Sequence, residues 1–213
     1  MDKTQVKILQ DALDIELSDE KAKIFGKYAG IFLEKNARTN LISKNDEKFL
    51  FEKHIFDSLA INKFLKNKKN LKRLLDIGTG GGFPSIPIAI LYDDINVFAI
   101  DSVGKKIKLL EEIKEELGLK NLFPICGRVE NDTQKYDYVT VRAVASLESC
   151  LKYAMPKLKS GGYFIAYKSK KALEELKAAE KTVKTSGAKM IDIVEYTLPL
   201  EEIYRRNLII FRK

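Results

Sequence analysis

The sequence predicts an α/β fold: a mostly parallel, seven-stranded sheet with helices on both faces, one antiparallel edge strand and an N-terminal helical extension. Three observations predict it. The first 66 residues show helical spacing of apolar side chains. From residue 73 onward, short β-like runs alternate with amphipathic helical stretches, which is typical of a parallel sheet. The last two β-like runs are joined only by a loop, which indicates a closing hairpin and an antiparallel edge.

The N-terminal extension contains a clear helix start. Ser18 is followed by two acidic residues, and a polar N-cap with acids in the first turn is typical of a helix N-terminus. Apolar residues, Tyr28 and Phe32 among them, then recur at helical spacing. Asn45 is expected to cap a second helix that extends to Phe64.

The polar stretch at residues 66–70 marks the expected division of the chain. It separates a helical extension, residues 1–70, from an α/β domain, residues 71–213. The expected strands of that domain are residues 73–77, 96–101, 122–126, 136–141, 163–168, 189–198 and 207–212. The expected helices are residues 85–92, 103–117, 146–155 and 169–186.

Composition excludes several classes of protein. The 213 residues and 45% hydrophobic content are enough for one sizeable core. We find no signal-peptide pattern and no run of about 18 apolar residues, so we expect a cytoplasmic protein without a membrane partner. Two cysteines and one histidine argue against a disulfide framework and a metal site. A monomer is the default expectation.

The net charge of +8 is unevenly distributed along the chain. Residues 1–72 carry a net charge of +4, residues 73–151 of −3 and residues 152–213 of +7. Basic flanks of this kind are either ordinary solvated surfaces or the binding surface of a polyanion such as RNA.

Four glycines in five positions follow the first predicted strand, in the stretch D76-I-G-T-G-G-G-F-P-S. A dinucleotide-binding G-x-G-x-x-G pattern does not fit, because neither Gly78 nor Gly80 has a glycine five residues later. The spacing of Asp76, Gly78, Gly80 and Gly82 fits acidic-x-G-x-G-x-G instead. This resembles motif I of the class I, Rossmann-like methyltransferases that use S-adenosylmethionine.

The next two strands end in residues that suit a nucleoside. Asp101 ends the second strand about 20 residues after the glycines, where an acid can accept hydrogen bonds from both ribose hydroxyls. NAD-binding folds use an acid there too, and Asp101 can also cap the next helix. The third strand leads to Gly127 and Glu130. In the methyltransferase class this turn contacts the adenine, whereas Glu130 taken alone is a surface carboxylate.

Further motifs, in a fixed order, extend this resemblance from about residue 18 to the C-terminus. They are N40-L-I-S43, K53-H-I-F-D-S58, D76-I-G-T-G-G-G-F-P-S-I-P87, D101-S-V-G-K-K106, R128-V-E130, R142-A-V-A-S-L147 and A166-Y-K168. The sequence resembles the RsmG family, also called GidB, of small-subunit ribosomal RNA methyltransferases. Two positions depart from the usual family pattern: Ser85 stands in place of a glycine, and Lys53 in place of an arginine.

The resemblance implies transfer of a methyl group from S-adenosylmethionine to N7 of one guanine in 16S rRNA, guanine 527, near the decoding centre. The partner is then 16S rRNA or the 30S ribosomal subunit. By the same resemblance, the cofactor-binding residues are Gly78, Gly80, Phe83, Asp101, Ser102, Val129, Glu130 and Arg142. Phe83 either lies against the cofactor or fills the core beneath the turn.

The residues bear independently on the atom that is methylated. Guanine N7 has a lone pair and needs no general base, only in-line placement of the methyl group. The Asn/Asp-Pro-Pro-aromatic motif of exocyclic amine methylation is absent after the fourth strand. Neither Cys126 nor Cys150 has the context of a nucleophile for cytosine C5. These absences agree with N7 chemistry.

Several cations and one histidine are candidates to position the guanine or bind RNA. They are His54, Lys105, Arg142, Lys168, Arg205 and Arg206, and register with the family implies Arg206 in preference to Arg205. Arg142 and Lys168 end the fourth and fifth strands, which directs Arg142 toward the cofactor cleft, and the arginine pair precedes the last strand. His54 either reaches over the cleft or packs the extension against the domain.

Two other functions remain open at the level of the sequence. One is a small-molecule methyltransferase with the same fold. The other is a nucleotide-binding module without catalysis, which would bind NAD in place of S-adenosylmethionine.

Overall fold

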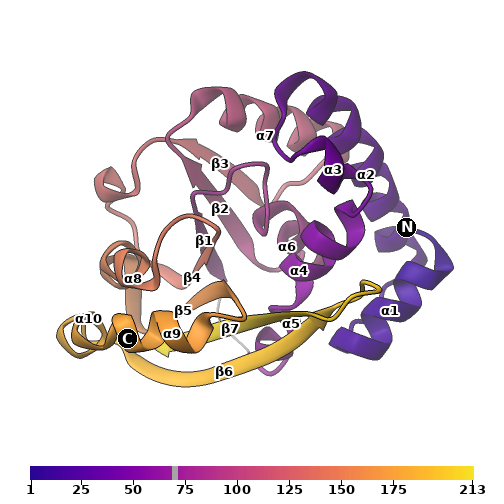
Figure 1. Cartoon of the computed structure of the whole chain (residues 1–213). Coiled ribbons are helices and arrows are strands. Elements are labelled where there is room, and N and C mark those ends of the chain that lie inside the picture. The colour runs from indigo at the N-terminus through magenta and orange to yellow at the C-terminus, as the bar shows by residue number, and fades with distance from the viewer. Residues whose placement is uncertain (69–71) are drawn as a thin grey trace.

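The computed structural model describes residues 1–68 and 72–213 and contains one seven-stranded sheet of order β3-β2-β1-β4-β5-β7-β6 (Figure 1). The strands are β1 Arg73–Ile77, β2 Asn96–Asp101, β3 Leu122–Cys126, β4 Tyr136–Arg142, β5 Leu158–Ser169, β6 Lys189–Leu198 and β7 Tyr204–Arg212. The pairs among β1 to β5 are parallel, and β7 pairs antiparallel with both β5 and β6. The predicted fold class is therefore confirmed.

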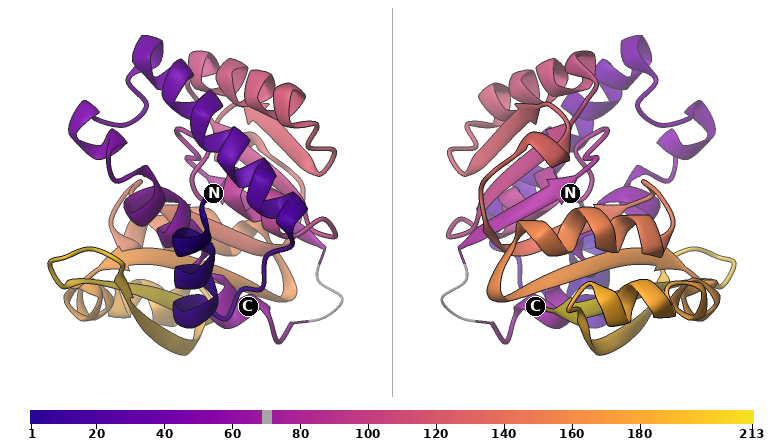
Figure 2. Two further views of the ribbon diagram at one scale, coloured as in Figure 1. Left: turned by 90° about the vertical axis from the view of Figure 1, so that its right-hand side faces the viewer. Right: turned by 90° about the vertical axis from the view of Figure 1, so that its left-hand side faces the viewer.

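Helices cover both faces of the sheet. Those of the N-terminal part are α1 Lys3–Leu13, α2 Asp19–Thr39, α3 Lys44–Glu47, the π-helix η1 Leu50–Phe56, α4 Asp57–Leu59 and α5 Asn62–Leu65. The later ones are α6 Ser85–Leu91, α7 Gly104–Leu117, the 3-10 turns η2 Val129–Asn131 and η3 Met155–Lys157, α8 Leu147–Ala154, α9 Ala172–Ala178 and α10 Glu180–Thr185. Figure 2 shows α2 lying along α7, so the extension packs directly on the domain.

Alternation along the strands divides the buried side chains between the two faces. On β7, Leu208 and Ile210 belong to one apolar cluster, and Ile209 and Phe211 belong to the other. The first cluster also contains buried apolar residues of α2, η1, α6 and α7, and the second contains those of α8. The N-terminal helices thus share a core with one face of the sheet.

Two parts of the N-terminal prediction differ from the structure. Ser18 caps α2 as predicted, but Ser43 and not Asn45 caps the next helix, because the Ser43 hydroxyl accepts from the Asp46 N–H at 3.2 Å. The expected continuous helix to Phe64 is interrupted by η1 and two short helices. Buried apolar residues of η1 are spaced five apart, as in Leu50 and Ile55, which fits the wider turn of a π-helix.

The C-terminal prediction also differs in its boundaries. Strand β5 begins at Leu158, earlier than predicted, and the helical stretch after it begins at Ala172 and breaks at Ala179. Strand β7 begins at Tyr204, so the arginine pair lies within the strand and not before it. The added residues pair with β6, where Tyr204 lies opposite Leu198, and Arg206 also pairs with Ser169 of β5.

No helix among the described residues is long and apolar enough to cross a membrane. The predicted division between residues 70 and 71 lies outside the described residues.

Candidate functional site

A pocket of about 500 Å³ opens at the carboxyl ends of β1, β2, β3 and β4. In an open α/β sheet, ligands bind at this edge, where the strand order reverses. The pocket brings together Gly78, Asp101, Ser102, Val129 and Glu130 of the predicted cofactor residues. Its other lining residues are Ile77, Ile100, Val103, Lys106, Gly127, Arg128, Ala143, Val144 and Tyr153.

The glycine turn needs its glycines for two reasons. Gly78, Gly80 and Gly82 have φ angles of +68°, +57° and +88°, in the region that favours glycine. A Cβ on Gly82 would also lie 2.4 Å from Cδ1 of Ile86, and one on Gly78 would lie 2.6 Å from Val144. The turn therefore presents bare backbone to the pocket, and side chains of its neighbours pack against it closely.

Asp101 joins the glycine turn to the start of α7. Its Oδ2 accepts a hydrogen bond from the Gly80 N–H at 3.0 Å, and its Oδ1 accepts one from the Val103 N–H at 2.9 Å. Lys106 Nζ lies 3.7 Å from Oδ2. Because each carboxylate oxygen has two lone pairs, one on each is left for a ligand. Asp101 can thus cap the helix region and accept from a ribose at the same time.

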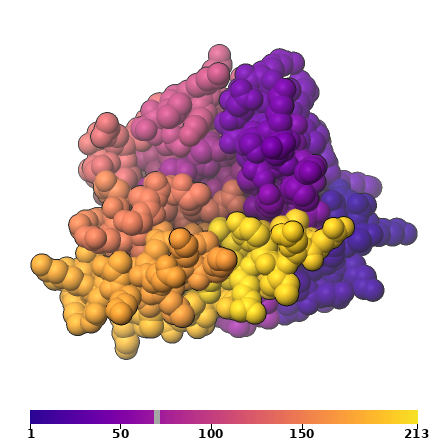
Figure 3. Space-filling model, viewed as in Figure 1, coloured from indigo at the N-terminus to yellow at the C-terminus, as the bar shows by residue number. Residues whose placement is uncertain are grey.

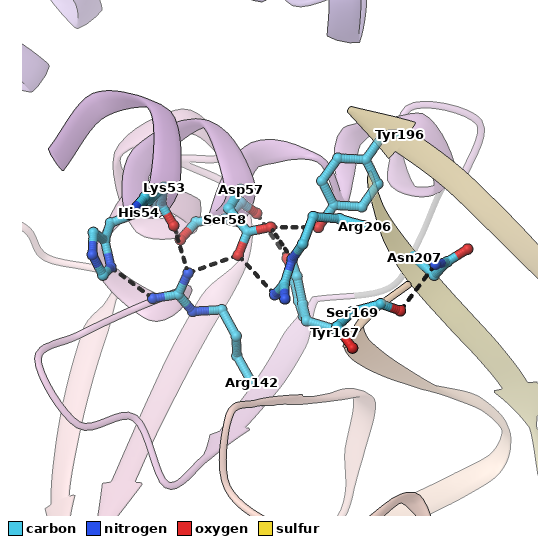
Figure 4. A network of polar contacts seen from close by, with 10 residues as sticks. All are labelled: Lys53, His54, Asp57, Ser58, Arg142, Tyr167, Ser169, Tyr196, Arg206 and Asn207. Atoms are coloured by element: carbon cyan, nitrogen blue, oxygen red, sulfur yellow. Dashed lines mark hydrogen bonds and ion pairs between the residues drawn. The ribbon is translucent and has the colours of Figure 1, made fainter. Parts of the chain in front are cut away.

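A second group of polar residues centres on Asp57 (Figure 4). This carboxylate is buried and receives hydrogen bonds from three residues that are distant in the sequence. Tyr196 donates to Oδ1 at 2.6 Å, Arg142 donates to Oδ2 at 2.7 Å, and Arg206 donates to both oxygens, at 3.0 and 3.1 Å. Asp57 therefore ties α4 to β4, β6 and β7.

The charges explain why Asp57 stays ionised. Burial alone raises the pKa of its carboxyl, but the two arginines and the Tyr196 hydroxyl outweigh burial and hold the pKa below its usual value. Both guanidinium groups are in turn occupied, since Arg142 and Arg206 are largely buried against this carboxylate.

Arg142 also binds the segment before Asp57. It donates to the Lys53 carbonyl and contacts Nδ1 of His54, each at 3.0 Å. Because an arginine can only donate, His54 Nδ1 is the acceptor, and the neutral ring carries its proton on Nε2. His54 Nε2 is buried without a partner among the described residues. Burial, followed by the charge of Arg142, lowers the pKa of His54 to about 4.

The lowered pKa of His54 predicts a pH-dependent stability. The unfolded histidine has a pKa near 6.5, so the neutral ring stabilises the fold fully above pH 6.5, and this contribution is lost as pH falls through about 4. We expect it to reach up to about 3 kcal/mol. Urea unfolding at a series of pH values, for the wild type and for His54→Asn, measures it. Asn keeps an acceptor for Arg142 and does not titrate.

The comparison with His54→Asn is necessary because Asp76 changes the stability with pH in the opposite direction. Burial raises the pKa of Asp76 to about 6, so the stability contributed by its protonated form is lost as pH rises through about 6. This effect is common to both proteins and cancels in their difference. Equal pH profiles for wild type and His54→Asn would contradict the assignment of a neutral, buried His54.

Phe83, Gly80 and Arg142 do not line the pocket, although the prediction placed them with the cofactor. Phe83 is buried and lies between the extension and the glycine turn, with its ring centroid 5.0 Å from that of Phe32 and 5.0 Å from that of His54. It fills the core beneath the turn, and Arg142 lies over its ring at 5.4 Å.

Lys168 is buried and binds the segment that follows β4. It donates to the Ala145 carbonyl at 2.9 Å and pairs with Glu175 at 2.8 Å. Glu175 also accepts from the Leu147 N–H at 3.0 Å. Lys168 and Glu175 therefore clamp residues 143–147, part of which forms a wall of the pocket. Lys105 lies apart from this group, on the exposed start of α7.

Sequence reasoning missed several walls of the pocket. Lys106 lines the pocket, whereas the prediction named its neighbour Lys105. Tyr153 of α8 also lines the pocket, although its helix is far along the chain. Ala143 has a φ of +55°, which turns the chain sharply after β4 and places Val144 over Gly78. Periodicity in the sequence predicts where strands end, but it does not predict which side chains a loop places over the pocket.

Ser85 fits its unusual position in the turn. Its hydroxyl lies 2.5 Å from that of Thr79, and both residues are buried. The hydroxyl thus finds a partner within the turn itself.

The fold is that of a class I, S-adenosylmethionine-dependent methyltransferase. The crystal structure of M. jannaschii TYW2 in complex with AdoMet matches with a TM-score of 0.55 and 20% identity over 69% of this chain and 71% of that one. Trm5b from Pyrococcus abyssi matches with a TM-score of 0.54 and 21% identity over 73% of this chain and 48% of that one. Likeness at this level of identity supports the fold.

Sequence comparison places the chain within one family of that class. The family described as rRNA small subunit methyltransferase G matches residues 21–207. A protein named ribosomal RNA small subunit methyltransferase G from Acetivibrio thermocellus is 38% identical over 205 residues, covering 93% of this chain and 83% of the relative. One of the same name from Alkaliphilus oremlandii is 37% identical, covering 93% and 85%. The chain belongs to this family, and its cofactor is S-adenosylmethionine.

Proposed function

We propose that this protein transfers a methyl group from S-adenosylmethionine to N7 of a guanine in 16S rRNA, at the position that the family resemblance gives as guanine 527. The family match over residues 21–207 carries the proposal. The chemistry of the site supports it, because N7 methylation needs placement and no proton acceptor. Nδ1 of His54 accepts a hydrogen bond from Arg142 and Nε2 carries the proton, so neither ring nitrogen is free to act as a proton acceptor. Burial raises the pKa of the Cys150 thiol, which disfavours a thiolate nucleophile.

In this proposal the cofactor occupies the 500 Å³ pocket. The backbone at Gly78 and Gly80 lies beneath its methionine and ribose part, and Asp101 accepts from the ribose hydroxyls. Val129 and Glu130 contact the adenine, and Ser102 lies at the rim. Val144 and Tyr153 are further walls of the same pocket.

We assign a positioning role to Arg142, His54 and Phe83. Their contacts run beneath the glycine turn and toward α4, so they support the floor of the pocket from the side of the extension. Lys168 and Arg206 position neighbouring segments in the same way, through Glu175 and Asp57. Lys105 is left as an exposed cation for RNA. We regard residues 1–70 as an extension that completes this site.

The partner in this proposal is 16S rRNA, free or within the 30S subunit, and the protein acts as a cytoplasmic monomer. The basic flanks of the sequence favour a polyanionic partner.

The test is methyl transfer from labelled S-adenosylmethionine to 16S rRNA and to 30S subunits that lack the modification. We expect about one methyl group per RNA, at a single guanine. Chemistry specific to N7-methylguanine should cleave the RNA strand at that guanine. Fully modified subunits are the matched control and should accept none. Transfer to another atom or to small molecules alone, or no transfer to either substrate, would contradict the proposal.

A further inference from the structure

A groove separate from the cofactor pocket opens where β5 ends and β7 begins. It has a volume of about 340 Å³ and is lined by Ser169, Lys170, Lys171, Ile203, Tyr204 and Arg205. In the space-filling view, the yellow turn before β7 and the orange segment after β5 lie beside each other on the face toward the viewer (Figure 3). None of these residues lines the cofactor pocket.

The groove combines free positive charge with exposed apolar surface. Lys170, Lys171 and Arg205 are exposed, and within residues 1–68 and 72–213 none of them has a carboxylate within ion-pair distance. Tyr204 is 48% exposed and Ile203 is 79% exposed. An exposed aromatic ring among unpaired cations is the usual composition of a single-stranded nucleic acid site, with phosphates on the cations and a base on the ring.

The two arginines at the start of β7 have separate tasks. Side chains alternate along a strand, and Arg206 turns inward to the buried Asp57. Arg205, one position earlier, lines the groove. The charge of Arg206 is therefore used within the protein, and that of Arg205 is available to a partner. Register with the family favoured Arg206 for contact with RNA, whereas the exposed side chain is that of Arg205.

The groove also lies at the correct edge of the sheet for the substrate. Parallel strands β4 and β5 both end at the edge where the cofactor pocket opens, and β7 begins there. Only β5 stands between β4 and β7, which is two strand spacings, or about 10 Å. A strand of RNA whose target base reaches the pocket can continue along this edge into the groove.

We propose that the groove of Lys170, Lys171, Tyr204 and Arg205 binds single-stranded RNA that flanks the methylated guanine. The cations contact phosphates, and Tyr204 stacks on one base. Glu201 and Glu202 lie in the same turn but line no part of the groove. The inference rests on the proposed function for its substrate, and RNA binding tests it separately from methyl transfer.

The test measures binding of unmethylated 16S rRNA over about 50 to 300 mM salt, for the wild type and for Lys170→Ala/Lys171→Ala/Arg205→Ala. Each phosphate contact to a single strand contributes about 0.7 to the salt slope and about fivefold to affinity at 0.1 M salt. We expect the triple variant to bind about a hundredfold more weakly, with a slope lower by about 2. Its affinity for S-adenosylmethionine should match that of the wild type.

The control is Lys3→Ala/Lys7→Ala/Lys120→Ala, which removes the same charge from exposed lysines outside the groove. Tyr204→Ala should weaken RNA binding about tenfold through lost stacking, and Tyr204→Phe should restore it. Equal affinity and equal slope for the two triple variants would overturn the inference. A loss confined to 30S subunits, with free rRNA bound normally, would also overturn it, because the groove would then contact protein.

Failure of the inference and failure of the proposed function give different results. If the wild type methylates the guanine and both triple variants bind RNA alike, only the RNA-binding role of the groove is disproved. A wild type that binds RNA through the groove without transferring a methyl group disproves only the activity.

Discussion

Asp57→Ala should lower the free energy of unfolding by about 3–5 kcal/mol, because it leaves two buried guanidinium groups without their carboxylate. Arg142 and Arg206 both bind Asp57, at 2.7 and 3.0 Å, and the carboxylate side chain is only 2% exposed. The loss of one partner of a buried ion pair costs far more than the loss of a surface pair, since the remaining charges stay desolvated. Urea unfolding at neutral pH measures the change.

The matched control for Asp57 is Glu34→Ala. Glu34 pairs with Arg38 at 3.2 Å, but both side chains are more than half exposed, so this change should cost less than about 1 kcal/mol. Asp57→Asn provides a second comparison, because it keeps the shape and one acceptor and removes the charge. Equal unfolding midpoints for Asp57→Ala and Glu34→Ala would show that the two arginines are not held by this carboxylate.

Asp101→Ala should weaken the binding of S-adenosylmethionine by about a hundredfold or more, since the two hydrogen bonds that we propose Asp101 accepts from the ribose are charge-assisted and each worth about 1.5–3 kcal/mol. The variant also frees the N–H groups of Gly80 and Val103, which now share the carboxylate. Calorimetric titration with S-adenosylmethionine measures the affinity directly, without any RNA.

Asp101→Asn separates the two consequences of that change. An amide keeps one acceptor oxygen for the turn or for a ribose hydroxyl, so its affinity should lie between those of the wild type and Asp101→Ala. Lys105→Ala is the control and should bind the cofactor as the wild type does, because Lys105 is exposed at the start of α7 and does not line the pocket. An Asp101→Ala protein that binds the cofactor as tightly as the wild type would remove Asp101 from the proposed site.

The parts of this site that the sequence predicted are local in the chain. The glycine turn and Asp101 each follow directly from a strand, and a parallel sheet brings the carboxyl ends of its strands to one edge. Gly78, Asp101, Val129 and Glu130 thus line one pocket, and their contact with the cofactor stays a prediction. The glycine spacing already resembled a motif of S-adenosylmethionine-dependent methyltransferases, and the family motifs then supplied the ribosomal RNA substrate.

The remaining parts depend on contacts between distant residues. Nothing in the local pattern around Asp57 indicates partners at Arg142 and Arg206, because those contacts arise only when strands pair in a particular register. A shift of one residue along β7 exchanges the inward and outward arginine. The prediction began β7 three residues late, so its preference for Arg206 came from register with the family and not from the strand.

The Asp57 contacts have a consequence for protein synthesis. The carboxylate belongs to the first third of the chain, but the strand that carries Arg206 is made last. While the ribosome is still translating, residue 57 has neither of its arginines at first and then only Arg142. The floor beneath the glycine turn is therefore completed only when β7 has emerged and paired with β5. A nascent chain shorter than this holds a glycine turn that lacks its full support.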